Sequence, residues 1–360
     1  MNDTILELLP VSEQPTVSSE PKEELFKDIV GQEPIKRILG FHLDSYTHTR
    51  IVPHMMIVAP KGQGKTTIAR EFAKGLIKFD ENGMVEMNAT TGKPRKKTFV
   101  EVNCSTLKNV KQFINGLIIP YVQDKDVTLL FDEASEIPHP IAMALLTILN
   151  PNPQNRTTFA MDEYVCDFDF ARQTFLFATS EIQKVFHALV DRLERLDLAE
   201  YSLDNLGKIV TKGLPDVTFE DGTLPEIASV LRGNARGAQK MAGKINSFLR
   251  GSKFFGFKEW AGLRAILNIL PLGLNATELG VLRYLAANPD GTSLTCLSAK
   301  TGMSRESLQK DVELYLMKHN LMSIETVGRQ ISATGLEYLR ALDGCAASGG
   351  GACANAVVQG

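Results

Sequence analysis

The residues with the clearest chemistry form a glycine-rich loop after a short apolar run. Residues 59–67 read A-P-K-G-Q-G-K-T-T and follow the apolar run 55–58. A buried strand, a tight loop and a helix beginning at Lys65 direct backbone N–H groups and the positive helix end toward one point, where anions bind. Gly62 and Gly64 lack the Cβ that would block close approach by a phosphate. The stretch therefore predicts a nucleotide phosphate site.

Individual residues of this loop have expected tasks. The Lys65 ammonium would reach the β- and γ-phosphates of ATP, and the Thr66 hydroxyl would hold Mg²⁺. Ala59 stands where the motif usually has glycine, so the site requires that this position does not need a positive φ angle. We expect the nucleotide to be bound by Lys61, Gly62, Gln63, Gly64, Lys65, Thr66 and Thr67.

A second apolar run ends in carboxylates. Residues 127–132 read V-T-L-L-F-D, and Glu133 follows. Asp132 at the strand end can bind Mg²⁺, and Glu133 can orient and polarise an attacking water. The alternative is a buried strand that ends in a surface acidic pair. We favour the functional interpretation because both runs end at the carboxyl edge of apolar strands, where open α/β sheets bind ligands.

The elements that must position these residues alternate between strand and helix. Periodicity predicts helices over 32–46, over 138–149 and from Lys65 onward. Short apolar runs predict further strands at 99–102 and 173–178. This alternation predicts an α/β fold with a parallel sheet.

Several motifs, taken in order, resemble those of the AAA+ ATPases. The resemblance is most specific to the RuvB family, the motors of Holliday-junction branch migration, and it covers roughly residues 24–340. Near the end, G-L-N-A-T-E-L-G-V-L-R-Y-L at 273–285 and V-G-R-Q-I-S-A-T at 327–334 are similar to the winged-helix domain of that family. The earlier motifs are F-K-D-I-V-G-Q-E at 26–33, the glycine-rich loop, L-F-D-E-A-S at 130–135, T-F-L-F-A-T-S at 174–180 and A-L-V-D-R-L-E-R at 188–195.

The resemblance implies roles for residues outside the loop. Ile29 and Val30 fall where the family's backbone holds adenine. Thr179 matches a sensor whose hydroxyl could hydrogen-bond the γ-phosphate or the attacking water, with Ser180 as the alternative.

Two arginines also gain implied roles. Arg192 matches the finger that one subunit donates to its neighbour's nucleotide; Arg195 is a substitute, and an ordinary surface salt bridge is the alternative for either. Arg236 matches the second sensor on the lid domain. It belongs to a basic series that steps by four and lies near one helix face if a single helix spans it: Arg232, Arg236, Lys240 and Lys244.

Sequence and resemblance together divide the chain into domains. A chain of 360 residues with 44% hydrophobic content can support two or three cores. We expect a mobile acidic N-terminal tail over 1–23, a large ATPase domain over 24–204, a helical lid domain over 205–271, a winged-helix domain over 272–340 and a disordered tail over 341–360.

The predicted winged-helix domain can also be recognised from its own residues. The turn 301–303 suits a helix-turn-helix, Ser304 can cap the third helix, and 327–330 suits a wing tip. Acidic and basic residues balance over 272–340, which argues for contact with few phosphates; use of this domain for protein contact is the alternative. The expected DNA-contacting residues are Arg305, Lys310 and Arg329.

Two segments depart from a plain ATPase domain. G-K-P-R-K-K at 92–97 is either a DNA-facing loop or, as we favour, an exposed basic turn. Residues 157–170 alternate around Asp162–Glu163 as a β-hairpin would, and their apolar members either project as a contact surface or pack on the sheet.

Composition narrows the class of protein. No stretch approaches about 18 uninterrupted apolar residues, and the N-terminus carries Asp3 and Glu7 rather than a basic signal-peptide start, so we expect a soluble cytoplasmic protein with no membrane partner. The cysteines have no C-x-x-C spacing, which argues against zinc and against a disulfide framework. A net charge of −3 gives no global attraction to nucleic acid, so any such contact must be local.

The resemblance implies an ATP-hydrolysing ring motor on double-stranded or branched DNA. A hexamer and a RuvA-like junction-binding partner are expected from the family. Two other functions stay open: a clamp or helicase loader that uses ATP as a switch, and a nucleotide-stabilised assembly with little turnover, against which Glu133 argues. The expected catalytic residues are Lys65, Asp132, Glu133, Thr179, Arg192 and Arg236, with Mg²⁺ held by Thr66 and Asp132.

Overall fold

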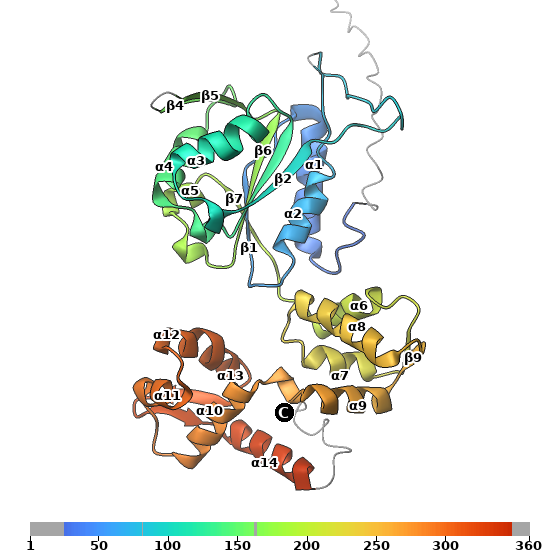
Figure 1. The fold of residues 1–360 in the computed structure, drawn as a ribbon, viewed down its shortest axis with the longest axis vertical. Coiled ribbons are helices and arrows are strands. Elements are labelled where there is room, and N and C mark those ends of the chain that lie inside the picture. Colours follow the sequence, from blue (N-terminus) through green and yellow to red (C-terminus); the bar gives the residue numbers. More distant parts are fainter. Residues whose placement is uncertain (1–24, 81, 162–163, 348–360) are drawn as a thin grey trace, which may run out of the picture. The chain divides into compact units, whose positions relative to one another are not determined.

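The computed structural model describes residues 25–347 apart from residue 81 and the pair 162–163. The chain separates into two compact units, residues 1–200 and 201–360 (Figure 1). The predicted acidic tail 1–23 lies outside the described residues. Each unit is described by itself below.

A five-stranded parallel sheet forms the centre of the first unit. Its strand order is β2-β3-β6-β1-β7. The prediction of a parallel α/β fold is confirmed, although β7 was not predicted because its short, charged sequence lacks an apolar run. The strands are β1 (Met55–Val58), β2 (Thr98–Asn103), β3 (Val127–Asp132), β6 (Gln173–Thr179) and β7 (Glu194–Asp197).

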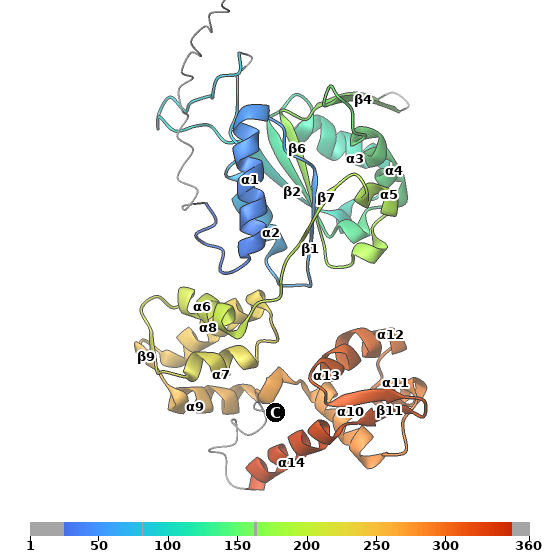
Figure 2. The ribbon, with the colours of Figure 1, turned by 180° about the vertical axis from the view of Figure 1, so that it is seen from behind.

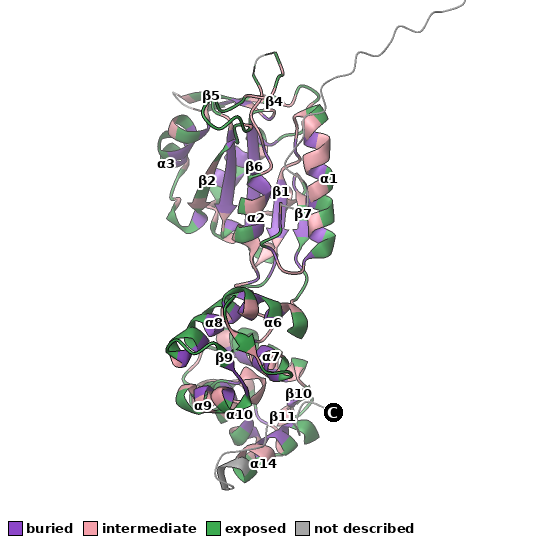
Figure 3. Ribbon diagram, turned by 90° about the vertical axis from the view of Figure 1, so that its right-hand side faces the viewer, coloured by how far each residue is buried: buried purple, intermediate pink, exposed green. Residues whose placement is uncertain are grey.

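Helices cover both faces of this sheet (Figures 1 and 2). Because water is excluded from both faces, β3 and β6 are buried along almost their whole length (Figure 3), which is why they read as continuous apolar runs. On one face lie α1 (Glu33–Thr49) and α2 (Lys65–Ala73); on the other lie α3 (Val110–Phe113), the π-helical segment Ile114–Val122, α4 (His139–Ile148) and α5 (His187–Val190).

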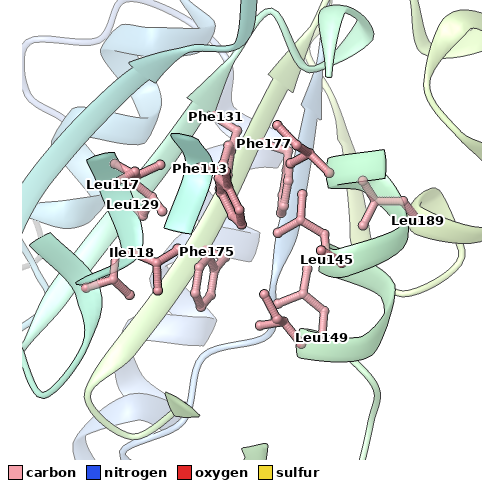
Figure 4. Close-up of a cluster of buried hydrophobic side chains, with 14 of the residues drawn as sticks. Phe113, Leu117, Ile118, Leu129, Phe131, Leu145, Leu149, Phe175, Phe177 and Leu189 are labelled. Carbon is pink, nitrogen blue, oxygen red and sulfur yellow. The ribbon is translucent and has the colours of Figure 1, made fainter. Parts of the chain in front are cut away.

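Stacked aromatic rings fill the core on the α3–α4 face (Figure 4). Phe131 of β3 stacks on Phe177 of β6 with ring centroids 4.8 Å apart, and the Phe131 and Phe175 centroids are 6.3 Å apart. Their sequence neighbours Leu130 and Leu176 belong to the second core, which packs against α1 and α2. Strand alternation therefore supplies two cores and fixes the direction of the strand ends.

The hairpin predicted over 157–170 is present as β4 (Arg156–Met161) and β5 (Tyr164–Asp169). The predicted turn Asp162–Glu163 lies outside the described residues. Phe159 is buried in the core whereas Val165 is 62% exposed, so the hairpin both packs on the domain and presents an apolar side chain.

The basic segment 92–97 belongs to a longer excursion, residues 77–97, which runs out and back beside α1. Lys93, Arg95 and Lys96 are exposed, as an exposed turn requires. Lys97 departs from that prediction because it is only 5% exposed. Its ammonium donates to Ala171 O at 2.9 Å and lies 4.9 Å from the Tyr46 ring centroid.

The first part of the second unit is a helical bundle. α8 begins at Ala235 and Arg232 precedes it with φ 56°, so a single helix does not span the four basic residues and the condition for their alignment is not met. The helices are α6 (Leu203–Lys212), α7 (Thr223–Ser229), α8 (Ala235–Leu249) and α9 (Phe257–Leu267), with a short parallel pair of β8 (Thr218–Phe219) and β9 (Phe254–Phe255).

The second part contains three helices, a two-stranded wing and a further helix after the wing. Ser304 caps the third helix by accepting a hydrogen bond from the Ser307 N–H at 3.1 Å, as predicted. α14 continues to Ala347, so the prediction of a disordered tail is wrong for 341–347. The elements are α10 (Ala276–Ala287), α11 (Leu294–Thr301), α12 (Arg305–Ser307), the π-helical segment Leu308–Glu313, α13 (Leu314–Lys318), β10 (Met322–Glu325), β11 (Gly328–Ile331) and α14 (Ala333–Ala347).

Across the part of the chain that the structure describes, no single helix is long and apolar enough to cross a membrane. One bent pair, Phe257–Gly273 with Ala276–Ala287, passes that test by length and composition alone.

The buried Lys97 predicts a pH-dependent stability. Burial lowers its pKa from 10.5 to about 8, against the smaller raising effects of Asp126 and Asp169 and with a lowering effect of Arg172. Between these two values the unfolded chain keeps the proton that the folded chain has released. The free energy of unfolding should therefore rise with pH across this window, by up to about 1.4 kcal/mol per pH unit.

Urea unfolding of wild type, Lys97→Met and Lys96→Met between pH 7.5 and 10 tests this. Lys97→Met should lose the rise, whereas Lys96→Met, at the exposed neighbouring position, should keep it. Identical pH profiles for wild type and Lys97→Met would contradict the assignment.

Candidate nucleotide-hydrolysis site

The glycine-rich loop joins β1 to α2 with the backbone that a phosphate cradle requires. Gly62 and Gly64 have φ angles of 83° and 90°, in the left-handed region that favours glycine. Ala59 is not among the residues with positive φ, so an alanine in place of the motif's glycine causes no left-handed backbone strain. Its N–H donates to Thr179 O at 3.2 Å, which holds the start of the loop on the neighbouring strand β6.

Lys65 lies at the first turn of α2 and turns back over the loop. Its Nζ donates to Ala59 O at 2.8 Å and to Pro60 O at 3.2 Å. The ammonium is therefore held at the loop opening, where the phosphates of a nucleotide would lie. Lys61 and Thr67 are exposed, whereas Gln63 is buried.

A hydrogen bond connects the two halves predicted from sequence. Thr66 Oγ1 donates to the Asp132 carboxylate at 2.9 Å. The sheet order places β6 between β1 and β3, and all three strands are parallel, so the loop after β1 and the end of β3 share one edge. A hydroxyl and one carboxylate suit Mg²⁺, which usually takes one or two protein carboxylates and completes its shell with phosphates and water. Within the described residues, no larger group of acidic, His and Cys side chains could form a metal cage.

Glu133 has a backbone that sequence alone did not reveal. Its φ is 56°, which an ordinary residue adopts only where the surroundings enforce it. Its N–H donates to Asp132 Oδ1 at 3.0 Å, and Glu136 N–H donates to its carbonyl at 2.8 Å. The side chain is exposed.

Thr179 ends β6 directly beside the loop. It is fully buried, and its Oγ1 accepts a hydrogen bond from the Glu181 N–H at 3.0 Å. The hydroxyl hydrogen remains a potential donor, so a sensor role is compatible with this geometry. Ser180, the predicted alternative, is half-buried.

Cys104 is a buried thiol near the carboxylates. Burial raises its pKa, and the negative charges of Asp132, Glu133 and Glu136 raise it further. The thiol therefore stays protonated at neutral pH.

The two arginines proposed for the finger differ in their contacts. Arg195 is exposed and forms a bidentate pair with Asp197, with its Nη2 2.7 Å from Oδ1. Arg192 is half-buried, its Nη1 donates to Ala188 O at 2.7 Å, and its Nε is buried with no hydrogen-bond partner in the described residues. An ordinary surface salt bridge was the alternative for both arginines, and Arg195 forms one.

The segment expected at adenine is tied to the end of the first unit. Ile29 is buried and Val30 is half-buried. Gln32, whose φ is 61°, donates through Nε2 to Ala199 O at 2.7 Å and accepts from Ala199 N–H at 3.0 Å. No local pattern indicated this pair of contacts, because it joins residues that are far apart in the chain.

The basic residues of the second unit have distinct surroundings. Arg236 lies in the first turn of α8, and its role as second sensor stays a prediction. Arg232 binds the fully buried Glu278 at 2.8 Å and stacks 3.5 Å from the Tyr315 ring centroid. These contacts join the helical bundle to the winged-helix domain within the second unit.

The three residues predicted to contact DNA also differ. Arg305 is exposed at the start of the third helix, and Lys310 is exposed and paired with Glu306 at 2.8 Å. Arg329 instead forms a bidentate pair with the buried Glu313, at 2.9 and 3.2 Å. A DNA contact by Arg329 would have to break this pair, so its position favours a structural role in fixing the wing.

Comparisons with known proteins agree with this arrangement. The family model of AAA ATPases (ATPase family associated with various cellular activities) matches residues 55–201, and that of the RuvB C-terminal winged helix domain matches residues 271–340. The chain is a RuvB-like AAA+ ATPase. As such it binds nucleotide.

Relatives of this group match along almost the whole chain. Two proteins named Holliday junction branch migration complex subunit RuvB are each 25% identical: one from Wolbachia sp. subsp. Brugia malayi (strain TRS), with 88% of this chain and 93% of the relative covered, and one from Orientia tsutsugamushi (strain Ikeda), with 94% and 100% covered. A solved structure of the Thermotoga maritima RuvB Holliday junction branch migration motor has a TM-score of 0.66 at 19% identity, covering 87% of this chain and 96% of that one, which supports the fold.

The Thr66–Asp132 hydrogen bond predicts the effect of removing one hydroxyl. Thr66→Val keeps the side-chain shape and removes the donor. Because hydrogen bonds to charged groups contribute about 1.5–3 kcal/mol, ATP turnover should fall by at least about tenfold.

A matched control lies on β3, the strand that ends in Asp132. Thr128 is fully buried, and its hydroxyl has no partner among the described residues. Thr128→Val should retain turnover and raise the free energy of unfolding by roughly 1 kcal/mol, because an unsatisfied hydroxyl is removed. Equal turnover of Thr66→Val and Thr128→Val would refute a role for the Thr66 hydroxyl.

Proposed function

We propose that this chain is an ATP-driven ring motor that moves DNA arms at four-way junctions. The observation that carries the proposal is one chain combining a hydrolysis site, joined through Thr66 and Asp132, with a winged-helix domain of the RuvB type. Its relatives over nearly their full length are named as branch-migration subunits. The match of the winged-helix domain favours a motor over a clamp or helicase loader, which would not need that ending.

In the proposed mechanism, the loop would bind the phosphates of ATP. Thr66 and Asp132 would hold Mg²⁺, which would supply positive charge to the phosphates together with Lys65. Glu133 orients and polarises the attacking water, while Thr179 senses the γ-phosphate through its hydroxyl. Ile29 and Val30 hold the base, and Arg236 acts as the second sensor.

Arg192 is proposed to act on the nucleotide of a neighbouring subunit. A guanidinium stays charged and spreads that charge over the migrating phosphoryl group. Arg192 is a better candidate than Arg195, because Arg195 is already bound bidentately to Asp197. In a ring, which we take to be hexameric, each complete site would then contain the loop of one subunit and Arg192 of its neighbour.

The DNA contact is proposed to begin with Arg305 at the start of the third helix. The balance of acids and bases in the winged-helix domain implies few phosphate contacts, so binding should weaken only moderately with salt. A RuvA-like protein that holds the junction is the expected partner.

Dissociation of a synthetic four-way junction tests the motor, with and without a RuvA-like partner. Wild type should separate the arms in the presence of ATP and Mg²⁺. Lys65→Ala should not, because it lacks the phosphate ligand. ATP hydrolysis by wild type without any junction movement would favour the loader, and nucleotide binding with negligible hydrolysis would favour the assembly module.

Mixed variants test the shared site. Arg192→Ala should lower ATP turnover by roughly 10³ to 10⁵, as loss of an arginine finger does. An equal mixture of Arg192→Ala and Lys65→Ala should regain activity, because about a quarter of the interfaces in a closed ring then pair an intact loop with an intact finger. Full turnover of Arg192→Ala together with loss in Arg195→Ala would transfer the role to Arg195.

A further inference from the structure

A groove in the first unit lies away from the loop that binds nucleotide. It has a volume of about 800 Å³ and runs between α1, the C-terminal end of α2 and residues 93–96. Its walls include Lys74 and Gly75, whereas the nucleotide loop meets the other end of α2 at Lys65. At about 1.5 Å per residue, the length of α2 separates the two places by more than 10 Å.

The floor of the groove is apolar and partly open. Phe41 lines it with 67% of its surface exposed, and Leu43 and Ile77 lie beside it. A Cβ added to Gly75 would lie 2.8 Å from the Leu43 side chain and 3.1 Å from that of Leu25. Leu25, the first described residue, is therefore packed into the groove wall, so the preceding chain starts at the groove itself.

The rim of the groove is strongly basic. Among the described residues that line it, Asp44 is the only acid. Two of the cations have acidic neighbours at the edge, since Lys36 pairs with Glu33 and Lys74 pairs with Glu71. An apolar floor with a cationic rim suits a ligand that is both apolar and anionic. The lining cations are Lys27, Lys36, Arg37, Lys74, Lys93 and Lys96.

The chain carries a segment with this composition in residues 1–24. Residues 3–9 read D-T-I-L-E-L-L, with four aliphatic side chains between and beside two carboxylates. From Glu13 to Glu24 four further acids stand against Lys22 alone. We propose that residues 3–9 dock in the groove, with their aliphatic side chains on the apolar floor and their carboxylates against the basic rim.

Because residues 3–9 belong to the same chain as the groove, even a weak contact between them is sufficient for docking. About 15 residues separate the docking segment from Leu25, enough chain to reach up to roughly 50 Å from it. Linkers of this length give effective concentrations in about the millimolar range. Docking covers Phe41 and neutralises the rim, so other polyanions would have to compete with the chain's own segment.

The rate at which a thiol placed in the groove is modified, in the full chain, reports how far the groove is covered. Thr47 lines the groove and is half-buried, and Thr47→Cys nearly preserves its size. Modification by N-ethylmaleimide, which is uncharged, is followed by mass spectrometry. Adding Leu6→Ser and Leu9→Ser should speed modification of residue 47 at least about threefold, as expected if roughly two thirds of the molecules hold the segment in place.

Controls separate docking from general effects. Val11→Ser with Val17→Ser, outside the docking segment, should leave the rate unchanged, and the exposed Cys296 serves as an internal standard. A synthetic peptide of residues 1–14 should restore protection to the Leu6→Ser, Leu9→Ser chain. That rescue should weaken when the rim carries Lys36→Glu and Arg37→Glu.

Three results would overturn the proposal. The first is an equal modification rate with and without the leucine substitutions. The second is equal protection by a peptide of scrambled sequence. The third is protection by oligothymidylate but not by the peptide, which would make the groove a nucleic-acid surface.

Discussion

The hydrogen bond from Thr66 to Asp132 is the contact on which the candidate hydrolysis site depends. It exists because β1, β6 and β3 are neighbours in a parallel sheet, so that the first turn of α2 and the end of β3 meet at one edge. Parallel strands buried on both faces cannot slip in register without moving apolar side chains out of two cores at once. Phe131 stacks on Phe177 one residue before Asp132, so this core contact holds the end of β3 against β6.

The sequence predicted those parts of the site that local chemistry determines. Apolar runs revealed the central strands, and glycine spacing revealed the loop. Ala59 stands where the motif usually has glycine, and its φ is not positive, as the prediction required. Long-range contacts carry no such local signal. The burial of Lys97 and the pairing of Gln32 with Ala199 follow from where distant elements meet, which a pattern of residue types does not specify.

The charged residues of the second unit also show that sequence composition does not reveal long-range contacts. The balance of acids and bases over 272–340 suggested weak contact with DNA, but part of that balance is internal. Arg329 pairs with Glu313, and Glu278 pairs with Arg232, each carboxylate being buried. Buried pairs contribute little net stability, yet breaking one leaves an uncompensated charge at a cost of about 3–5 kcal/mol. These two pairs therefore fix the wing and the junction between the helical bundle and the winged-helix domain. They also leave fewer cations available to contact DNA.

Gln32 offers a physical connection between nucleotide binding and the point where the chain leaves the first unit. It follows Ile29 and Val30, proposed to hold the base, and its two hydrogen bonds fix Ala199 just beyond β7. β7 in turn follows Arg192, the proposed finger. The segment proposed to hold the base and the residues that lead into the second unit are therefore joined by these two hydrogen bonds. Both bonds use the amide side chain of Gln32, which belongs to the motif at residues 26–33.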